Sequence, residues 1–597
     1  MSSGGSSWNR FTRLKFSSKV VNKRLQKLER GSLRHARKFV TSRLDRLSSV
    51  RRNVSGWIIL VMLMIGVSAA QWAASKDAYM ITTYTSGGSY SDGVLGPLET
   101  LNPIFAKTSA ERSAAKLLFA GLYKYDTTGN IKSDLAESMT VNQKETEYIV
   151  KLRKDLRWSD GKNITAADVV FTLKLLASPE TRAEISGWQS IKFEKIDELT
   201  VKFILPSSYA PFAHALTFPV LPEHILRDVK PSELREHPFG KSPVTSGPFA
   251  FRMLQNVTSD GSKKILYTVA NDNYYGGTPK LERFQLYVYP SQNDIVKSLR
   301  TREITGTPEL VYNNQPDEIK NTYSSEPHTI NNGVYALFNS TSQYLQSKPV
   351  RQALALSINV SEMRKLLSSE TEEMNGPVLN NFLDEKVKPK GYNVKKAKGL
   401  LDAAGWKVIG GVRQKDNQKL TLNIVAPKNE NYEKLAKRLA EIWQKELNIA
   451  TDVKIVDVND VSQSILQNVL LPRNFDVLIY ELAMGGDPDV YAYWHSSQAT
   501  SGGLNFSNYN NAVADDALAS GRSKLSKRQR MDRYGKFTSI WQQDIPAIAL
   551  YQTKIDYIHL NSVKALAEDA SLVSAVDRYT DVDRKSTRLN SSHGSAS

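Results

Sequence analysis

The fold class is decided by residues 420–480, which read LTLNIVAPKNENYEKLAKRLAEIWQKELNIATDVKIVDVNDVSQSILQNVLLPRNFDVLIY. Short apolar runs at Leu420–Val425, Val453–Val456 and Asp476–Tyr480 predict three strands. The spacing of the apolar residues between them predicts amphipathic helices over Tyr432–Leu447 and Val461–Val469. Strands that alternate with helices are typical of a mostly parallel sheet covered by helices. We therefore expect an α/β protein.

The same mixture of elements is found closer to the N-terminus. Glu147–Arg153 (EYIVKLR) alternates apolar and polar residues like a half-buried strand. After the turn at Asp160-Gly161, Thr165 and Asp168 have the spacing of a capping box, which predicts the start of a helix. No fixed-period repeat is visible, so a solenoid or a propeller is not expected.

Length and charge indicate an ordinary globular body with a basic N-terminal tail. A chain of 597 residues is too long for one compact core, so two or three domains are expected. Residues 1–55 hold 15 of the 79 Lys and Arg residues but two of the 61 acidic residues, which leaves the rest of the chain nearly neutral. A basic tail on a near-neutral body does not describe a nucleic-acid-binding protein.

An uncharged apolar run, Trp57–Ala74 (WIILVMLMIGVSAAQWAA), follows the tail. Its 18 residues just reach the thickness of a bilayer, so we expect one transmembrane helix over residues 56–74. Arg51 and Arg52 precede the run, and the two charges after it cancel. The positive-inside rule then places residues 1–55 in the cytoplasm and the body outside, attached to the cell membrane by a single pass. A signal peptide cleaved near Gln71 is the alternative, although its basic region would be unusually long.

The sequence contains few residues or motifs that are typical of catalytic or metal-binding sites. The chain has no cysteine, which excludes disulfides, thiolate metal sites and a cysteine nucleophile. Its eight histidines include no pair three or four residues apart, so no preformed metal site is expected. The sequence contains no phosphate-binding loop, no nucleophile elbow and no zinc-protease motif. We therefore expect a protein that is not an enzyme and that has no cofactor.

Several segments carry a family resemblance. Tyr148–Thr172 reads YIVKLRKDLRWSDGKNITAADVVFT, and shorter matches include TLNP at 100–103, PVTSGPF at 243–249 and DVLIYELAMGGDP at 476–488. In this order the segments resemble the peptide-binding branch of the bacterial extracellular solute-binding proteins, family 5, over roughly residues 95–580. The resemblance implies a two-lobed, periplasmic-binding-protein-like fold of type II with an extra subdomain. It also implies an oligopeptide ligand and, as partners, the permease and ATPase subunits of an ABC importer.

The resemblance also implies domain boundaries. The first lobe is expected over residues 78–335, with an inserted subdomain at about 109–240, and is completed by residues 548–582 after a second lobe at 336–547. Residues 583–597 include the run DRKSTRLNSSH, which reads like a translated sequencing adapter, so we expect this tail not to be native. The alternatives to a peptide importer are a binder of another solute, such as a nickel chelate, and a sensory receptor with the same fold.

The ligand is expected between the lobes, next to the loop that follows the strand Asp476–Tyr480. Peptide binders of this family carry an aspartate at the position of Met484, where it pairs with the α-ammonium group of the peptide. Since methionine cannot neutralise that charge, either Glu481 supplies it or the ligand has no free N-terminus there. The alternatives are a solvated strand end for Glu481 and a turn-forming role for Asp487.

The loop is expected to face Val94–Leu98 and the turn Ser246-Gly247-Pro248 across the cleft. For the aromatic side chains near the loop, a place in the hydrophobic core is the alternative to a place in the cleft. The expected ligand-binding residues are Gly96, Pro97, Ser246, Gly247, Tyr480, Glu481, Met484, Gly485, Gly486, Asp487 and Trp494.

Overall fold

The computed structural model describes residues 51–79, 87–383, 387–388, 391–457, 464–523, 526–563, 566–567 and 569–583. It divides the chain into two units, one with the helix α3 (Arg51–Tyr79) and one from Tyr84 onward, called the body here, and each is described by itself. The tails before residue 51 and after residue 583 lie outside the described residues. Within the described part of the chain, no helix is both long enough and apolar enough to cross a membrane.

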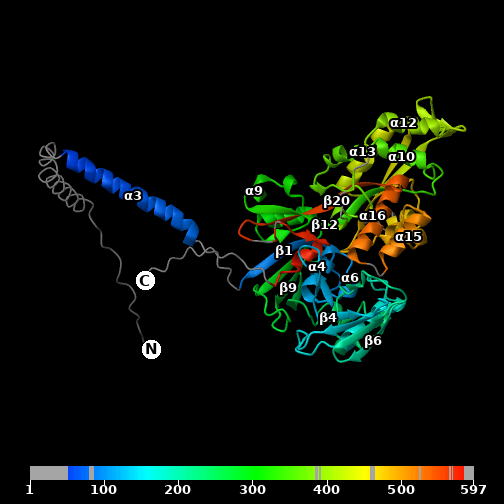
Figure 1. Ribbon diagram of the computed structural model, residues 1–597. Helices are drawn as coiled ribbons and strands as arrows, with labels where there is room; N and C mark the ends of the chain where they lie inside the picture. The colour runs from blue at the N-terminus through cyan, green and yellow to red at the C-terminus, as the bar shows by residue number, and fades with distance from the viewer. Residues whose placement is uncertain are drawn as a thin grey trace, which may run out of the picture. The chain divides into compact units, whose positions relative to one another are not determined.

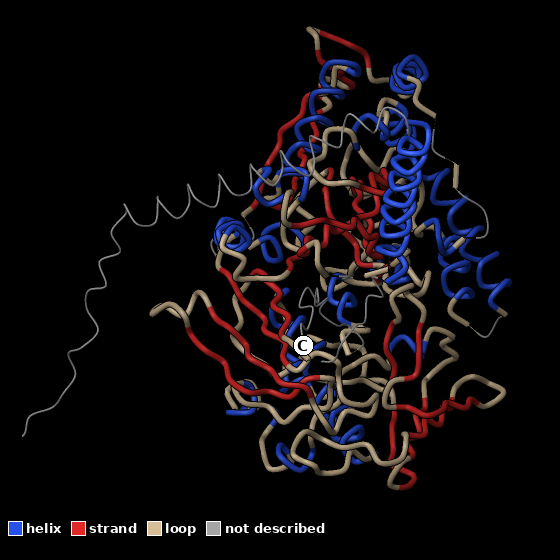
Figure 2. The backbone as a smooth tube through the Cα atoms, turned by 90° about the vertical axis from the view of Figure 1, so that its left-hand side faces the viewer, coloured by secondary structure: helices blue, strands red, loops and turns tan. Residues whose placement is uncertain are grey.

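A 12-stranded sheet runs through the body. Figure 2 shows its strands in red between blue helices. Two short strands, β13 (Thr371–Glu372) and β21 (Ser571–Leu572), pair with β20 and β12 at the side of the main path. The main path is β18 (Ala450–Val456), β17 (Thr421–Pro427), β19 (Val477–Ala483), β12 (Tyr323–Phe338), β20 (Ala547–Leu560), β11 (Gly306–Thr307), β1 (Ser89–Leu95), β10 (Arg283–Tyr289), β9 (Lys264–Ala270) and β8 (Phe249–Asn256).

The β18 end of the sheet has the parallel pairing expected from residues 420–480. β17 pairs in parallel with both β18 and β19, and helix α13 (Glu430–Leu447) connects β17 to β18. The predicted α/β architecture of this stretch is confirmed. The helix expected over Val461–Val469 begins in residues 458–463, which lie outside the described residues. The part that is described is a π-helical turn, Leu466–Leu470.

Two long strands run from one lobe to the other. β12 has 16 residues and β20 has 14, and they pair antiparallel along most of their length. On the side of the first lobe β20 also pairs with β11, and on the side of the second lobe β12 also pairs with β19. The register between β12 and β20 shifts between Thr329 and Gly333. The ladder is therefore interrupted where the two strands pass between the lobes, and we call β12 and β20 the hinge strands.

An inserted subdomain carries a four-stranded antiparallel sheet with the order β4 (Ala136–Val141), β5 (Glu147–Leu152), β7 (Thr200–Ile204) and β6 (Lys192–Asp197). Helix α5 (Ala166–Ala177) covers it and begins with the predicted capping box, in which the Thr165 N–H donates to Asp168 Oδ2 at 2.8 Å. In Figure 1 this sheet lies at one end of the body, and β12 and β20 lie between it and helices α12 (Val394–Ala403) and α13.

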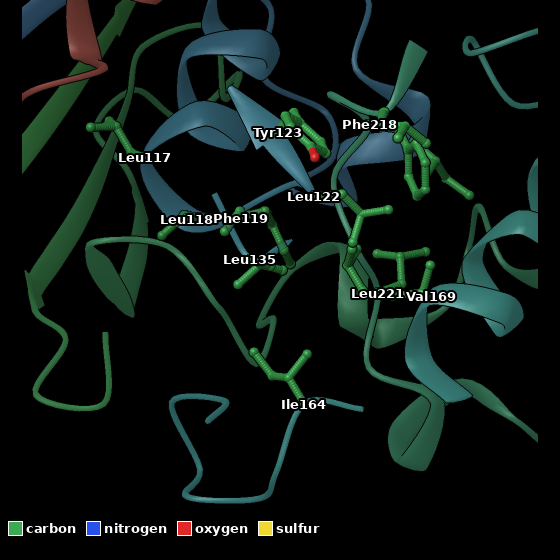
Figure 3. Close-up of a cluster of buried hydrophobic side chains, with 14 of the residues drawn as sticks. Leu117, Leu118, Phe119, Leu122, Tyr123, Leu135, Ile164, Val169, Phe218 and Leu221 are labelled. Carbon is green, nitrogen blue, oxygen red and sulfur yellow. The ribbon is translucent and has the colours of Figure 1, made fainter. Parts of the chain in front are cut away.

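Each lobe has its own hydrophobic core. The core of the first lobe extends into the subdomain, and Figure 3 shows part of it, including Leu122, Val169 and Leu221. In the second lobe the sheet is covered on both faces. Neighbouring residues of β19 point to opposite faces and pack in two different clusters. Ile479 packs in the cluster that contains α13. Leu478 packs in the cluster that contains α15 (Ala512–Gly521) and α16 (Lys527–Asp544).

The C-terminal segment returns to the first lobe. Arg578 and Asp92 form an ion pair with 3.1 Å between Nη2 and Oδ2, and both side chains are completely buried. The Tyr579 hydroxyl also donates to Asp92. Because leaving one member of a buried ion pair without its partner costs about 3–5 kcal/mol, these contacts fix residues 575–579 against strand β1. They place Asp577 beside Lys116 of helix α4 (Ser109–Leu118).

Candidate ligand-binding cleft

Two adjoining cavities lie where the second lobe meets the first lobe and its subdomain. Their volumes are about 740 Å³ and about 470 Å³, and Ile185, Thr217 and Pro219 line both of them. The second lobe contributes Arg522 to the larger cavity and Gly485 to the smaller one. Cavities of this size are within the range that binds small ligands. We refer to the two together as the interlobe cleft.

The loop Met484–Asp489, which we call the interlobe loop, approaches the first lobe very closely. A Cβ atom on Gly486 would lie 2.3 Å from Cε1 of Tyr125 and 3.0 Å from Nδ1 of His214, so a larger residue does not fit without displacement. Gly485 has a φ angle of +69°, which favours glycine. The Gly485 carbonyl accepts a hydrogen bond from Asn331 Nδ2 at 2.8 Å. The two glycines therefore allow the loop to lie directly against the first lobe.

Asp487 of the interlobe loop is held by Arg530 of α16. Two guanidinium nitrogens donate to its carboxylate at 2.6 and 2.9 Å, in a bidentate pair. On the other side, Nε2 of His214 lies 3.9 Å from Oδ2 of Asp487, and the Tyr125 hydroxyl lies 3.1 Å from Nδ1 of the same imidazole. Burial lowers the pKa of His214, and the nearby Asp487 opposes this effect. Asp487 therefore lies between the lobes, and both of its carboxylate oxygens are already engaged by Arg530.

A second group of contacts joins the lobes at the end of the interlobe loop. Nε of Arg522 lies 2.9 Å from Oδ2 of Asp489, and the Tyr209 hydroxyl of the subdomain donates to the same oxygen at 3.2 Å. The Arg522 guanidinium also lies 4.9 Å from the centre of the Tyr209 ring, a cation–π distance. Burial raises the pKa of Asp489, and Arg522 opposes this effect. The structure is thus one in which the two lobes are in direct contact.

Met484 and Trp494 point away from the cleft. Their exposed fractions are 4% and 0%, and both belong to the core cluster packed around α15 and α16. The Trp494 ring packs against Tyr335 and Trp541, with ring centres 5.6 and 5.5 Å apart. Met484 is fixed to the hinge strand by its N–H, which donates to the Asn331 carbonyl at 2.7 Å. Of the alternatives left open for Trp494, its surroundings correspond to the core.

The residues expected on the first-lobe side hold loops together. Ser246 is buried, and its hydroxyl accepts a hydrogen bond from the Ala120 N–H at 3.0 Å. Gly247 lies so close to helix α4 that a Cβ atom would be 2.7 Å from the Leu117 carbonyl oxygen. The next residue in this turn, Pro248, does line the smaller cavity.

Gly96 and Pro97 follow the end of strand β1 and line neither cavity. The Gly96 N–H donates to the Tyr289 carbonyl at 2.9 Å, and the Pro97 carbonyl accepts from the Thr108 hydroxyl at 2.7 Å. The structure therefore brings Gly485 to the cleft, puts Gly486 and Asp487 at the contact between the lobes, and leaves Gly96 and Pro97 outside.

Glu481 and Tyr480 lie on β19, before the interlobe loop, and line neither cavity. The Glu481 carboxylate accepts hydrogen bonds from Thr553 Oγ1 at 2.6 Å, Asn332 Nδ2 at 3.2 Å and the Tyr432 hydroxyl at 3.3 Å. All three donors are neutral. The Tyr480 ring packs edge-on against Phe506, with ring centres 5.5 Å apart. The role of Glu481 as acceptor of an α-ammonium group stays a prediction.

The smaller cavity contains charged residues that sequence reasoning missed. Lys116 pairs with Asp577 at 3.0 Å, and Lys124 lies 3.5 Å from Asp134. Asp134 also accepts from the Gly121 N–H at 3.2 Å. Lys116 and Asp577 are 461 positions apart, so no local spacing could have indicated this pair.

In the described part of the chain, no group of three or more His, Asp or Glu residues is placed to hold a metal ion. The histidine that lines the larger cavity, His214, is engaged by Tyr125 and Asp487 as described above.

Comparison with known proteins identifies the relatives of this fold. The family model for "Bacterial extracellular solute-binding proteins, family 5 Middle" matches residues 130–521. The chain is 28% identical over 523 residues to the oligopeptide-binding protein AppA of Bacillus subtilis (strain 168), covering 84% of this chain and 94% of that protein. The AppA structure from Bacillus subtilis in complex with a nonapeptide superimposes with a TM-score of 0.68 at 24% identity, over 85% of this chain and 100% of that one.

A second solved structure, NikZ from Campylobacter jejuni in complex with Ni(L-His), superimposes with a TM-score of 0.69 at 22% identity. The match covers 84% of this chain and 99% of that one. At these identities the structural likeness shows the fold, which is the two-lobed, periplasmic-binding-protein-like α/β fold expected from the sequence.

Proposed function

Because the chain belongs to the bacterial extracellular solute-binding proteins, family 5, we propose that it captures oligopeptides in the interlobe cleft and delivers them to an ABC-type permease. The family is one of solute-binding proteins rather than enzymes, so the protein holds its ligand without changing it. The observation that carries the proposal is the pair of adjoining cavities, about 740 and 470 Å³, located where the lobes meet. Relatives named as peptide binders support the choice of ligand class.

The chemistry of the cleft supports a ligand that is extended and varied in its side chains. The larger cavity is lined by apolar and aromatic side chains, such as Trp188 and Phe212, together with hydroxyl groups such as Ser208. Roomy apolar walls accept many side chains, whereas a few polar groups hold the peptide backbone that all peptides share. The second lobe would then contact the ligand through Gly485 of the interlobe loop at the smaller cavity and through Arg522, which follows helix α15, at the larger one.

We also propose that the body stays attached to the outer side of the cell membrane through the segment 56–74. Two features support this arrangement: the uncharged run Trp57–Ala74 and the basic residues before it. Along the described part of α3, every large apolar side chain from Trp57 to Val67 is exposed. A tether of this kind would keep the binding protein near its permease and ATPase.

Calorimetric titration of the full-length chain, purified in detergent, tests the ligand class. We expect saturable binding of one peptide per chain and no binding of Ni(II)–histidine. Mass spectrometry of small molecules that co-purify with the chain would name natural ligands. If the nickel complex binds and oligopeptides do not, the chelate-binding alternative is correct and the peptide proposal fails.

A substitution at Gly486 tests whether the binding site is the interlobe cleft. Gly486→Leu should prevent close approach of the lobes, because Tyr125 and His214 already occupy the space. Overpacking of this kind costs about 1–3 kcal/mol, which corresponds to a roughly five- to hundredfold loss of peptide affinity. Gly502→Leu is the matched control, since the space around Gly502 is open. Equal affinities for both variants and the wild type would place the ligand elsewhere.

A further inference from the structure

The acidic and basic side chains around the interlobe cleft differ in whether they are already paired within the protein. Among the described residues that line the larger cavity there is no aspartate or glutamate, and its charged or titratable members include His214 and Arg522. The smaller cavity is lined by three acidic residues and three basic ones. The acidic residues are Asp134, Glu184 and Asp577, and the basic residues are Arg112, Lys116 and Lys124.

Each of the three acidic side chains is already paired with a cation of the protein. Asp577 lies 3.0 Å from Nζ of Lys116. Glu184 lies 3.2 Å from Nζ of Lys107 and 3.5 Å from Nη2 of Arg235.

Asp134 lies 3.5 Å from Nζ of Lys124 and also accepts hydrogen bonds from the Gly121 N–H and the Tyr275 hydroxyl. A ligand ammonium group placed in the cleft would therefore have to displace a protein cation to find a carboxylate.

Arg112 is different, because its guanidinium has no ion pair or hydrogen bond with the described residues. It lies on helix α4, one turn before Lys116, so both side chains are on the same face of that helix. Its side chain is exposed at the cavity wall, where solvent screens its charge while the cleft is empty. A ligand that covers this wall reduces the screening and strengthens the interaction with any negative group placed there.

We infer that the interlobe cleft recognises the carboxylate end of its ligand through Arg112 and has no binding site for the charge of the ammonium end. This inference rests on the proposed peptide-binding function and narrows it to peptides with a free carboxylate at the smaller cavity. A planar guanidinium binds a carboxylate through two parallel hydrogen bonds, which an amide end cannot reproduce. An ammonium group buried in the same place would meet only carboxylates that are already paired with protein cations. Peptides with a blocked N-terminus and a free C-terminus therefore belong to the ligand class.

The test compares four forms of one peptide with the full-length chain by titration calorimetry: free or acetylated at the N-terminus, and free or amidated at the C-terminus. The free carboxylate form should bind roughly ten- to a hundredfold more tightly than the amide, and acetylation should change the affinity little. Arg112→Gln should remove the difference between acid and amide. Arg252→Gln, which removes the same charge from an exposed position outside the cleft lining, should preserve it.

Two results would overturn the inference. If the wild type binds the acid and amide forms with equal affinity, Arg112 does not recognise the carboxylate, although the proposed peptide binding remains supported. If acetylation weakens binding strongly and amidation does not, the ammonium end is the one recognised. Absence of binding for all four forms would contradict the proposed function as well, and is distinguished from the first two results by the missing heat signal for every peptide.

Discussion

The carboxylate of Glu481 accepts hydrogen bonds from three neutral donors on three different elements. Thr553 belongs to β20, Asn332 to β12 and Tyr432 to α13, so one side chain ties both hinge strands to the second lobe. From the sequence, Glu481 was the nearest carboxylate able to replace the acidic residue missing at position 484. These two roles lead to different expectations for the same substitution.

Glu481→Gln should lower the stability of the body by about 1–3 kcal/mol, because the amide retains one acceptor oxygen and turns an N–H₂ group toward donors. A lowered melting temperature in differential scanning calorimetry checks this, with Glu137→Gln as the control, since Glu137 is exposed. Any preference between free and acetylated peptides should survive the substitution. If that preference disappears while the melting temperature stays constant, Glu481 binds the α-ammonium group as the sequence predicted.

At the scale of an element, the interlobe loop is one part of the second lobe that touches the subdomain. It lies against Tyr125 and His214 on one side and is held by Arg530 on the other. Burial in this contact lowers the pKa of His214. If the loop withdraws when the lobes open, the imidazole becomes hydrated and its pKa returns toward about 6.5. The open form then takes up more protons than the closed form as the solution becomes acidic.

Peptide affinity should therefore decrease as the pH falls from about 7.5 to about 5. Titration calorimetry at several pH values measures this loss. His214→Gln should flatten the profile, whereas His224→Gln, whose imidazole bonds Asp160 away from the cleft, should keep it. Burial raises the pKa of Asp489, which acts in the opposite direction, so the difference between wild type and His214→Gln is the decisive quantity. Identical profiles for the two proteins would contradict the expectation.

At the scale of the whole molecule, one sheet joins both lobes through β12 and β20, and the chain returns to the first lobe at its C-terminal segment. The buried pair of Arg578 and Asp92 fixes that segment, which also supplies Asp577 to the smaller cavity. The cleft is thus built from residues at both ends of the body. The proposed role of the N-terminal segment as a membrane tether leads to a separate prediction.

Protease added to intact cells should degrade the body and leave a protected fragment that contains residues 1–55. The reason is that a basic flank precedes the apolar run, and for this order the positive-inside rule predicts a cytoplasmic N-terminus. Immunoblotting with an antibody against the N-terminal tail detects the fragment, and lysed cells serve as the control in which it disappears. A mature protein that begins near Gln71 would instead show that the segment is a cleaved signal.

The sequence by itself determined the family, the α/β class and several local elements. These follow from short-range patterns: the alternation in residues 420–480, the capping box of Thr165 and Asp168, and the ordered family motifs. The site was predicted less well. The position of the interlobe loop at the cleft follows the family motif, and Gly485 lines the smaller cavity, whereas its role in ligand binding stays a prediction.

The tertiary structure alone decided which side chains of the loop face the cleft and which charges remain available. Met484, the first residue after β19, packs in the core cluster around α15 and α16 and does not line the cleft. Lys116 finds its counter-charge at Asp577, 461 positions away, and Arg112 finds none among the described residues. Pairing of charges depends on distances across the folded chain, so it is set by packing of the lobes and not by any local pattern.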